Sequence, residues 1–144
     1  MRDHPVAALS EPSPPASAFR TWLPIVGVPV GVWAALPHFL SPPLATTDRV
    51  EIADHVIPGL VVIAISTLAL VMWRKAGRPE WPMFAGGLAV LLAGLWMAAT
   101  HLGLVAQATC DEAPWAAAIY HGASAVTVLL FGLGWVWSYW SEVG

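Results

Sequence analysis

The sequence predicts an all-α integral membrane protein with four transmembrane helices. Of its 144 residues 58% are hydrophobic and only 10% are charged, whereas soluble domains carry about 25% charged residues. The apolar residues gather in four segments, each close to the ~20 residues that a helix needs to cross a bilayer. Because the hydrocarbon core offers no water to the backbone, segments of this length are expected to cross it as helices.

The four segments divide the chain into a tail and a bundle. Residues 1–20 are polar and proline-rich and predict a disordered cytoplasmic tail, and residues 21–144 form the predicted four-helix bundle. The predicted helices cover roughly residues 22–41, 52–73, 81–107 and 115–140. Proline removes a backbone donor and tends to kink a helix. We therefore expect a bent first helix, which contains Pro24 and Pro29 and ends near Pro37 or Pro42.

Charge predicts the orientation of the bundle. Short loops rich in Lys and Arg stay in the cytoplasm, and five of the six basic residues lie in the tail or in the connection RKAGRPE: Arg2, Arg20, Arg74, Lys75 and Arg78. Both termini are therefore predicted to be cytoplasmic, in a multi-pass protein of a bacterial inner (cytoplasmic) membrane. Five tryptophans at the predicted inner helix ends agree with an interfacial aromatic belt: Trp22, Trp73, Trp81, Trp137 and Trp140.

Composition and motifs exclude several function classes. The sequence has no clustered basic face for nucleic acid. The single cysteine, Cys110, lies beside two acidic residues, and no Cys/His zinc pattern accompanies it. Hydroxyl residues in the helices have no base at useful spacing, so the sequence does not favour an enzyme. The expected partners are the lipid bilayer and a membrane protein or a second copy of the chain.

An internal repeat places histidines at matching positions. GVWAALPH (31–38) and GLWMAATH (94–101) share the pattern Gly-x-Trp…His, and 94 − 31 and 101 − 38 both equal 63. A further histidine starts the second helix of each half, His55 in residues 21–75 and His121 in residues 79–140. Because each repeat contains two membrane helices, the second repeat starts on the same side of the membrane as the first. We therefore expect two parallel repeats that are related by an axis along the membrane normal.

The repeat resembles the SPW repeat of small bacterial membrane proteins. RPEWPMFAGGLAVLLAGLWMAATHLG is similar to the first helix of that repeat and VWAALPHFL to its ending, whereas Leu-Pro-His and Ala-Thr-His replace the Ser-Pro-Trp signature. The resemblance implies a fold and little chemistry.

The four histidines are predicted to face one another near the outer leaflet. Each ends or begins a helix on the outer side: His38, His55, His101 and His121. Residues seven apart share a helix face, and in every case that face carries small residues, which mark contacts between membrane helices. Gly87, Gly94 and His101 form one such stripe, and His121, Ala125, Val128 and Gly132 form another. Ionisable residues at membrane depth are functional-site candidates.

Haem and a transition metal are the candidate ligands. Imidazole is an axial ligand of haem iron, so a non-covalent haem b would bind to His38 with His101, or to His55 with His121. Gly31 and Gly94 would leave room for the porphyrin, and Trp33 and Trp96 would line the pocket or simply pack the helices. Neutral imidazoles also suit Zn, Cu, Fe or Ni, with Glu51, Asp54, Asp111 or Glu112 as further ligands or as groups that orient the rings.

Two function classes follow from the sequence. The first is a small membrane protein that binds haem or a metal through its histidines, with a role in electron transfer or sensing. The second is a cofactor-free structural or assembly subunit of a membrane complex, in which the glycines serve helix packing alone.

Overall fold

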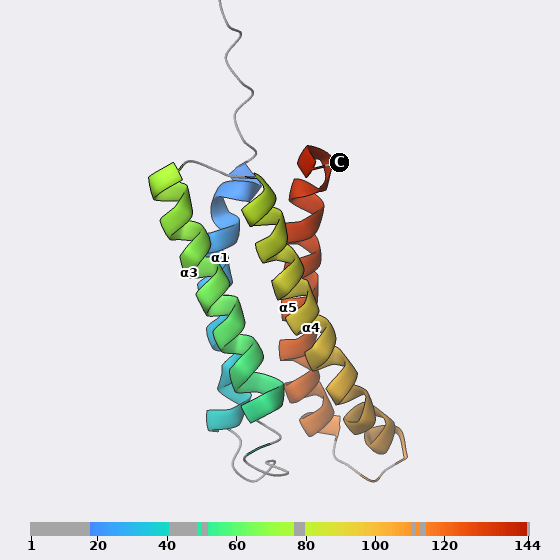
Figure 1. Cartoon of the computed structure of the whole chain (residues 1–144). Helices are drawn as coiled ribbons and strands as arrows, with labels where there is room; N and C mark the ends of the chain where they lie inside the picture. The colour runs from blue at the N-terminus through green and yellow to red at the C-terminus, as the bar shows by residue number, and fades with distance from the viewer. Residues whose placement is uncertain are drawn as a thin grey trace, which may run out of the picture.

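The computed structural model describes residues 18–40, 49, 52–76, 80–110, 112 and 115–143, and throughout these residues the fold is all-α. The helices are α1 (Ala18–Leu40), η2 (Ile52–Val56), α3 (Ile57–Ala76), α4 (Glu80–Thr109) and α5 (Trp115–Val143) (Figure 1). Four of these helical stretches are long and apolar enough to cross a membrane. The prediction of four apolar membrane helices is therefore confirmed at this level.

The first helix is longer than the sequence indicated. It begins at Ala18, inside the predicted tail, and continues past Pro24 and Pro29 to Leu40. Arg20 lies in its first turn, and the guanidinium carbon is 5.0 Å from the ring centroid of Tyr139 on α5. This cation–π contact helps to explain why helical structure begins ahead of the apolar run.

The second membrane segment of the chain begins with a π-helical turn. Residues Ile52–Val56 form η2, which leads directly into α3. Proline at position 58 cannot donate to the carbonyl of Asp54, and its ring crowds that carbonyl in an α-helix. A wider turn relieves this crowding. π-turns of this kind are rare and occur frequently at functional sites, and this one carries His55.

Close backbone contacts join the helices in pairs. A Cβ on Gly31 would lie 2.7 Å from the carbonyl oxygen of Gly59, so α1 and α3 touch through their backbones. A Cβ on Gly94 would lie 2.6 Å from the backbone of Leu129, which gives α4 and α5 an equally tight contact. Figure 1 shows α1 beside α3 and α4 beside α5 along their lengths. Small residues at such contacts are typical of membrane helix packing.

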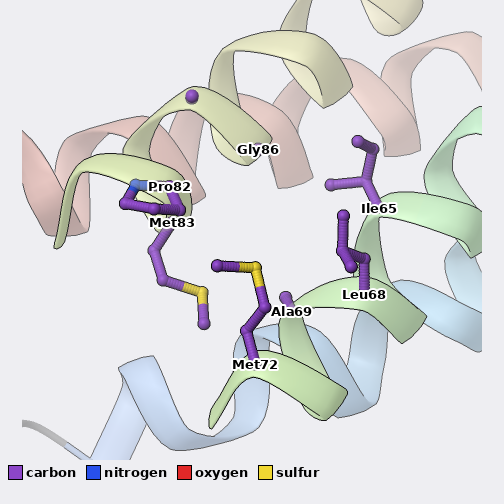
Figure 2. A pocket seen from close by; sticks show the side chains of 8 residues that line it. Ile65, Leu68, Ala69, Met72, Pro82, Met83 and Gly86 are labelled. Atoms are coloured by element: carbon purple, nitrogen blue, oxygen red, sulfur yellow. The ribbon is translucent and has the colours of Figure 1, made fainter. Parts of the chain in front are cut away.

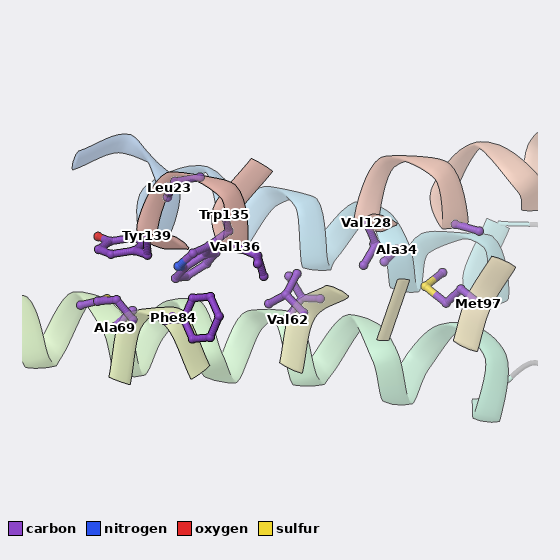
Figure 3. Close-up of a cluster of buried hydrophobic side chains, with 13 residues drawn as sticks. Leu23, Ala34, Val62, Ala69, Phe84, Met97, Val128, Trp135, Val136 and Tyr139 are labelled. Atoms are coloured by element: carbon purple, nitrogen blue, oxygen red, sulfur yellow. The ribbon is translucent and has the colours of Figure 1, made fainter. Parts of the chain in front are cut away.

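Side chains from all four long helices fill the centre of the bundle. Ala34, Val62 and Val128 are completely buried, and so is Trp135 nearer the end of α5 (Figure 3). Val90 on α4 is completely buried as well. Large apolar side chains such as Leu92, Leu102 and Leu130 are exposed on the outside. An apolar exterior around a packed core is what a lipid solvent requires.

The two ends of the bundle differ in chemistry. One end, the histidine end, carries His55, His101 and His121 where α3 and α5 begin and α4 approaches its end. The opposite end, the basic end, carries Arg20, Arg74 and Lys75, near the start of α1 and the finish of α3. Figure 1 shows the start of α1, the finish of α3 and the start of α4 together at this basic end.

Two apolar grooves lie between α3 and α4. The groove nearer the basic end has a volume of about 290 Å³, and Met72 and Met83 reach into it from the two helices (Figure 2). The groove nearer the histidine end has a volume of about 400 Å³ and is bordered by Ile57 and Trp96. Neither lining contains a nitrogen-bearing or acidic side chain that would hold a polar ligand, apart from the indole of Trp96.

Candidate metal centre

Three buried histidines meet inside the histidine end of the bundle. His55 comes from η2, His101 from α4 and His121 from α5, and their exposed fractions are 1%, 8% and 5%. One ring nitrogen from each lies within 4.8 Å of the other two, which is close enough for all three to bind one ion. We call this group the histidine cluster.

Helix periodicity directs each ring inward, as the sequence predicted. On α3, Gly59, Val62 and Ser66 lie on the face below His55, and all three are buried. On α5, Ala125, Val128 and Gly132 continue the face of His121 and are buried as well. On α4, Gly87 and Gly94 share the buried face of His101.

His55 is at the centre of the cluster. Its Nε2 is 2.8 Å from Nδ1 of His121 and 3.0 Å from Nε2 of His101. The ring centroid of His55 is 4.7 Å from that of His101 and 5.0 Å from that of His121, and the outer two rings stack at 5.7 Å. The three nitrogens thus converge on one small volume.

Backbone carbonyls fix the protonation of two of the rings. His55 Nδ1 is 3.2 Å from the carbonyl oxygen of Ala34, and His101 Nδ1 is 2.6 Å from that of Met97. A carbonyl oxygen only accepts, so both Nδ1 atoms are the donors. In the neutral rings the lone pairs of both Nε2 atoms then face each other across 3.0 Å. Two lone pairs repel at this distance unless a proton or a metal ion lies between them.

Ser124 lies beside the cluster. Its Oγ donates to the carbonyl of His121 at 2.7 Å and lies 3.5 Å from His55 Nδ1. Ser124 is completely buried. Metal-bound histidines typically donate their other ring N–H to a carbonyl or carboxylate, which fixes the orientation of the ring. The contacts of His55 and His101 with Ala34 and Met97 have this form.

Of the remaining predicted ligands, some lie outside the described residues and the others are not part of the cluster. His38 lies in the last turn of α1, four residues after Ala34, and its side chain is outside the described residues. Glu51 and Asp111 are also outside them. Asp54 is half-buried and Glu112 is exposed. Among the described residues, the group with metal-binding geometry contains the three histidines and no carboxylate.

The residues expected to surround a flat ligand pack elsewhere. The positions beside Gly31 and Gly94 are filled by the neighbouring helices. Trp33 and Trp96 are 39% and 55% exposed, so their rings are on the outside of the bundle. Sequence periodicity identified which positions face inward, but it did not indicate that opposing backbones would occupy the space in front of the two glycines.

Several groups that hold the cluster were not predicted from the sequence. The carbonyls of Ala34 and Met97 and the hydroxyl of Ser124 touch the histidine rings or their backbone. Met97 lies one helical turn before His101, and Ser124 lies one turn after His121, so helical spacing could have identified these two.

Comparison of the chain with family models, curated proteins and solved structures found no match.

Proposed function

We propose that this chain is a membrane metal protein that holds one transition-metal ion on His55, His101 and His121. The observation that carries the proposal is the pair of Nε2 atoms that face each other at 3.0 Å while both Nδ1 atoms donate to carbonyls. A metal ion accepts both lone pairs and removes their repulsion. His121 supplies the third nitrogen through Nδ1.

The ligand set selects a class of ion. Three imidazole nitrogens suit Zn, Cu, Fe or Ni, whereas Ca²⁺ and Mg²⁺ require oxygen ligands. Three protein ligands also leave one position of a tetrahedral ion open to water or another small ligand. His38 remains a predicted fourth ligand, because its place in α1 is one turn beyond the carbonyl that holds His55.

The spacing of the rings favours a single ion over haem. Two nitrogens bound to one tetrahedral ion at 2.0–2.1 Å are about 3.3 Å apart. The observed separations of 2.8 Å and 3.0 Å need only a small outward movement to reach this value. A haem held by two of the rings would need the porphyrin plane between them, where the rings now touch.

The packing beneath the cluster favours a resident ion over a transported one. Val62, Val90, Met97 and Val128 are completely buried on the side of the cluster that faces the basic end. Pathways for ions are lined by polar groups or carbonyls, and this layer offers apolar side chains. A resident copper or iron ion would support electron transfer, and a resident zinc ion would support sensing.

We also propose that the two helix pairs arose by duplication, in line with the predicted resemblance to the SPW repeat. Gly31 packs on Ile63, and Gly94 packs on Leu129. The first residues of these two contacts are 63 apart in sequence, and the second residues are 66 apart, which is also the separation of His55 and His121. Equivalent residues therefore make equivalent contacts.

Metal analysis of the purified protein tests the proposal. The chain is purified in mild detergent with an affinity tag that contains no histidine, then loaded separately with Zn²⁺, Cu²⁺, Fe²⁺ and Ni²⁺. After gel filtration, elemental analysis is expected to find about one ion per chain for at least one metal. The triple variant H55A/H101A/H121A is expected to retain none.

The matched control is His4→Ala, which removes a histidine from the predicted tail and leaves the cluster intact. It is expected to bind metal like the wild type. A metal-free and colourless wild-type protein with full helicity would reject the metal centre and favour the cofactor-free subunit. A haem spectrum in the preparation from cells would instead favour haem.

A further inference from the structure

A third groove lies at the basic end, between α1 and α3, and it differs from the two grooves between α3 and α4. It has a volume of about 320 Å³, and its lining consists of Ile25, Leu70, Trp73 and Arg74. Two apolar side chains, one aromatic ring and one cation therefore border the same space. No carboxylate is part of this lining.

The lining residues are ordered along the helix axis. Arg74 lies in the last turn of α3, which ends at Ala76. Leu70 is one turn deeper, about 6 Å further from the helix end. Trp73 is adjacent to the arginine and half-buried, and Ile25 faces the groove from α1. Going inward, the groove thus presents a cation, an indole ring and then hydrocarbon.

We propose that this groove is a binding site for an anionic phospholipid. The guanidinium of Arg74 would hold the phosphate, since arginine pairs with phosphate oxygens through two parallel N–H groups. The indole of Trp73 would lie at the level of the glycerol, where tryptophan is enriched in membrane proteins. An acyl chain would then run along Leu70 and Ile25.

Charge complementarity selects an anionic lipid over a zwitterionic one. The ammonium group of a phosphatidylcholine or phosphatidylethanolamine head would find no carboxylate in the lining and would face Arg74 instead. Lys75 and Arg20 add positive charge at the same end of the bundle, against the carboxylate of Glu80 in the first turn of α4. Basic clusters of this kind attract anionic lipids by about 1 kcal/mol per residue, or about fivefold in affinity.

Native mass spectrometry of the full chain tests the site. The protein is titrated with phosphatidylglycerol and phosphatidylcholine of the same acyl composition. The wild type is expected to bind phosphatidylglycerol more tightly. Arg74→Gln is expected to lose clearly more than the about fivefold that one surface charge contributes, because it also loses the paired N–H contacts with the phosphate. Arg74→Lys keeps the charge and is expected to recover part of the loss. Circular dichroism checks that each variant remains helical.

Lys75→Gln is the matched control, because Lys75 is an exposed neighbour that is not part of the lining. It is expected to lose no more than the about fivefold that one surface charge contributes. Equal losses in the two variants would overturn the groove site and leave a general surface attraction. The groove site would also be overturned if the wild type showed no preference for phosphatidylglycerol. The same holds if glycerol phosphate, which has no acyl chain, displaced the lipid. The metal content serves as an independent readout, since neither variant touches the histidine cluster.

Discussion

His55 Nε2 lies 2.8 Å from His121 Nδ1, although 66 residues separate the two histidines in sequence. The contact links η2 in one helix pair to α5 in the other. Its partner His101 also belongs to the second pair, at 3.0 Å from the same Nε2 atom. The cluster therefore lies at the interface of the two helix pairs. Among the described residues, His55 is the only ring of the cluster that comes from the pair formed by α1 and α3.

The three histidines are expected to differ in their importance for metal binding. His55→Ala removes the ring that touches both others, and it should lower the affinity for the ion by more than about 100-fold, beyond the 10–100-fold typical of supporting groups. His101→Ala and His121→Ala each leave two adjacent rings and should retain weaker binding. Competition with a chromogenic chelator measures the affinities. Equal effects of the three variants would contradict a central role for His55.

The variant His38→Ala tests whether the ion is held by three or by four protein ligands. If His38 is the fourth ligand, the variant should lose affinity to an extent similar to His101→Ala. If it is not, binding should match the wild type and the open position of the ion should be taken by solvent. The same chelator competition decides between the two cases.

The bound ion is expected to be released by acid. Metal binding requires deprotonated imidazole nitrogens, so protons compete with the ion and the affinity falls as the pH falls. The metal content should therefore fall progressively as the pH is lowered. Elemental analysis after dialysis at each pH measures this loss, with circular dichroism in parallel. Retention of the ion until the helices unfold would indicate a different ligand set.

The sequence alone was sufficient to predict the helices and the inward-facing positions of His55, His101 and His121. Apolar runs of transmembrane length predicted the helices, and the seven-residue spacing placed Gly94 and His101 on one buried face. Both properties follow from local periodicity. The π-turn at Ile52–Val56 was not predicted, because it depends on how Pro58 is accommodated at the start of a packed helix.

Other features of the site depend on contacts between distant segments. The carbonyl of Ala34 holds the ring of His55 from another helix, and no local pattern indicates such a pair. Which nitrogen of each ring faces the other rings depends on the side-chain rotamers, and the sequence does not specify these. The same limit explains Gly31 and Gly94, since an inward glycine accommodates a ligand or an opposing helix equally well.

The orientation in the membrane can be tested with the native cysteine. Cys110 is a free and exposed thiol just after the end of α4, on the side of the histidine end. The positive-inside rule predicts that the basic end is cytoplasmic, so Cys110 should face outward. A membrane-impermeant maleimide is expected to label it in intact spheroplasts, with Cys110→Ser as the unlabelled control. Labelling only after lysis would reverse the proposed orientation.

Packing at Gly94 is expected to control both stability and metal binding. A Cβ at this position would lie 2.6 Å from the backbone of Leu129, and backbone atoms cannot move aside as a side-chain tip does. Gly94→Ala should therefore push α4 away from α5 and cost roughly 1–3 kcal/mol, as overpacking does elsewhere. Because His101 and His121 lie on these two helices, the affinity for the ion should fall as well.

Gly103→Ala is the matched control on the same helix. A Cβ there meets nothing within 4 Å, so the variant should be neutral or gain up to about 1 kcal/mol from the better helix propensity of alanine. Thermal unfolding in detergent and metal content are measured for both variants. If Gly94→Ala keeps wild-type stability and metal content, α4 and α5 do not pack through this glycine. If it loses stability but binds metal normally, the position of the histidines does not depend on that contact.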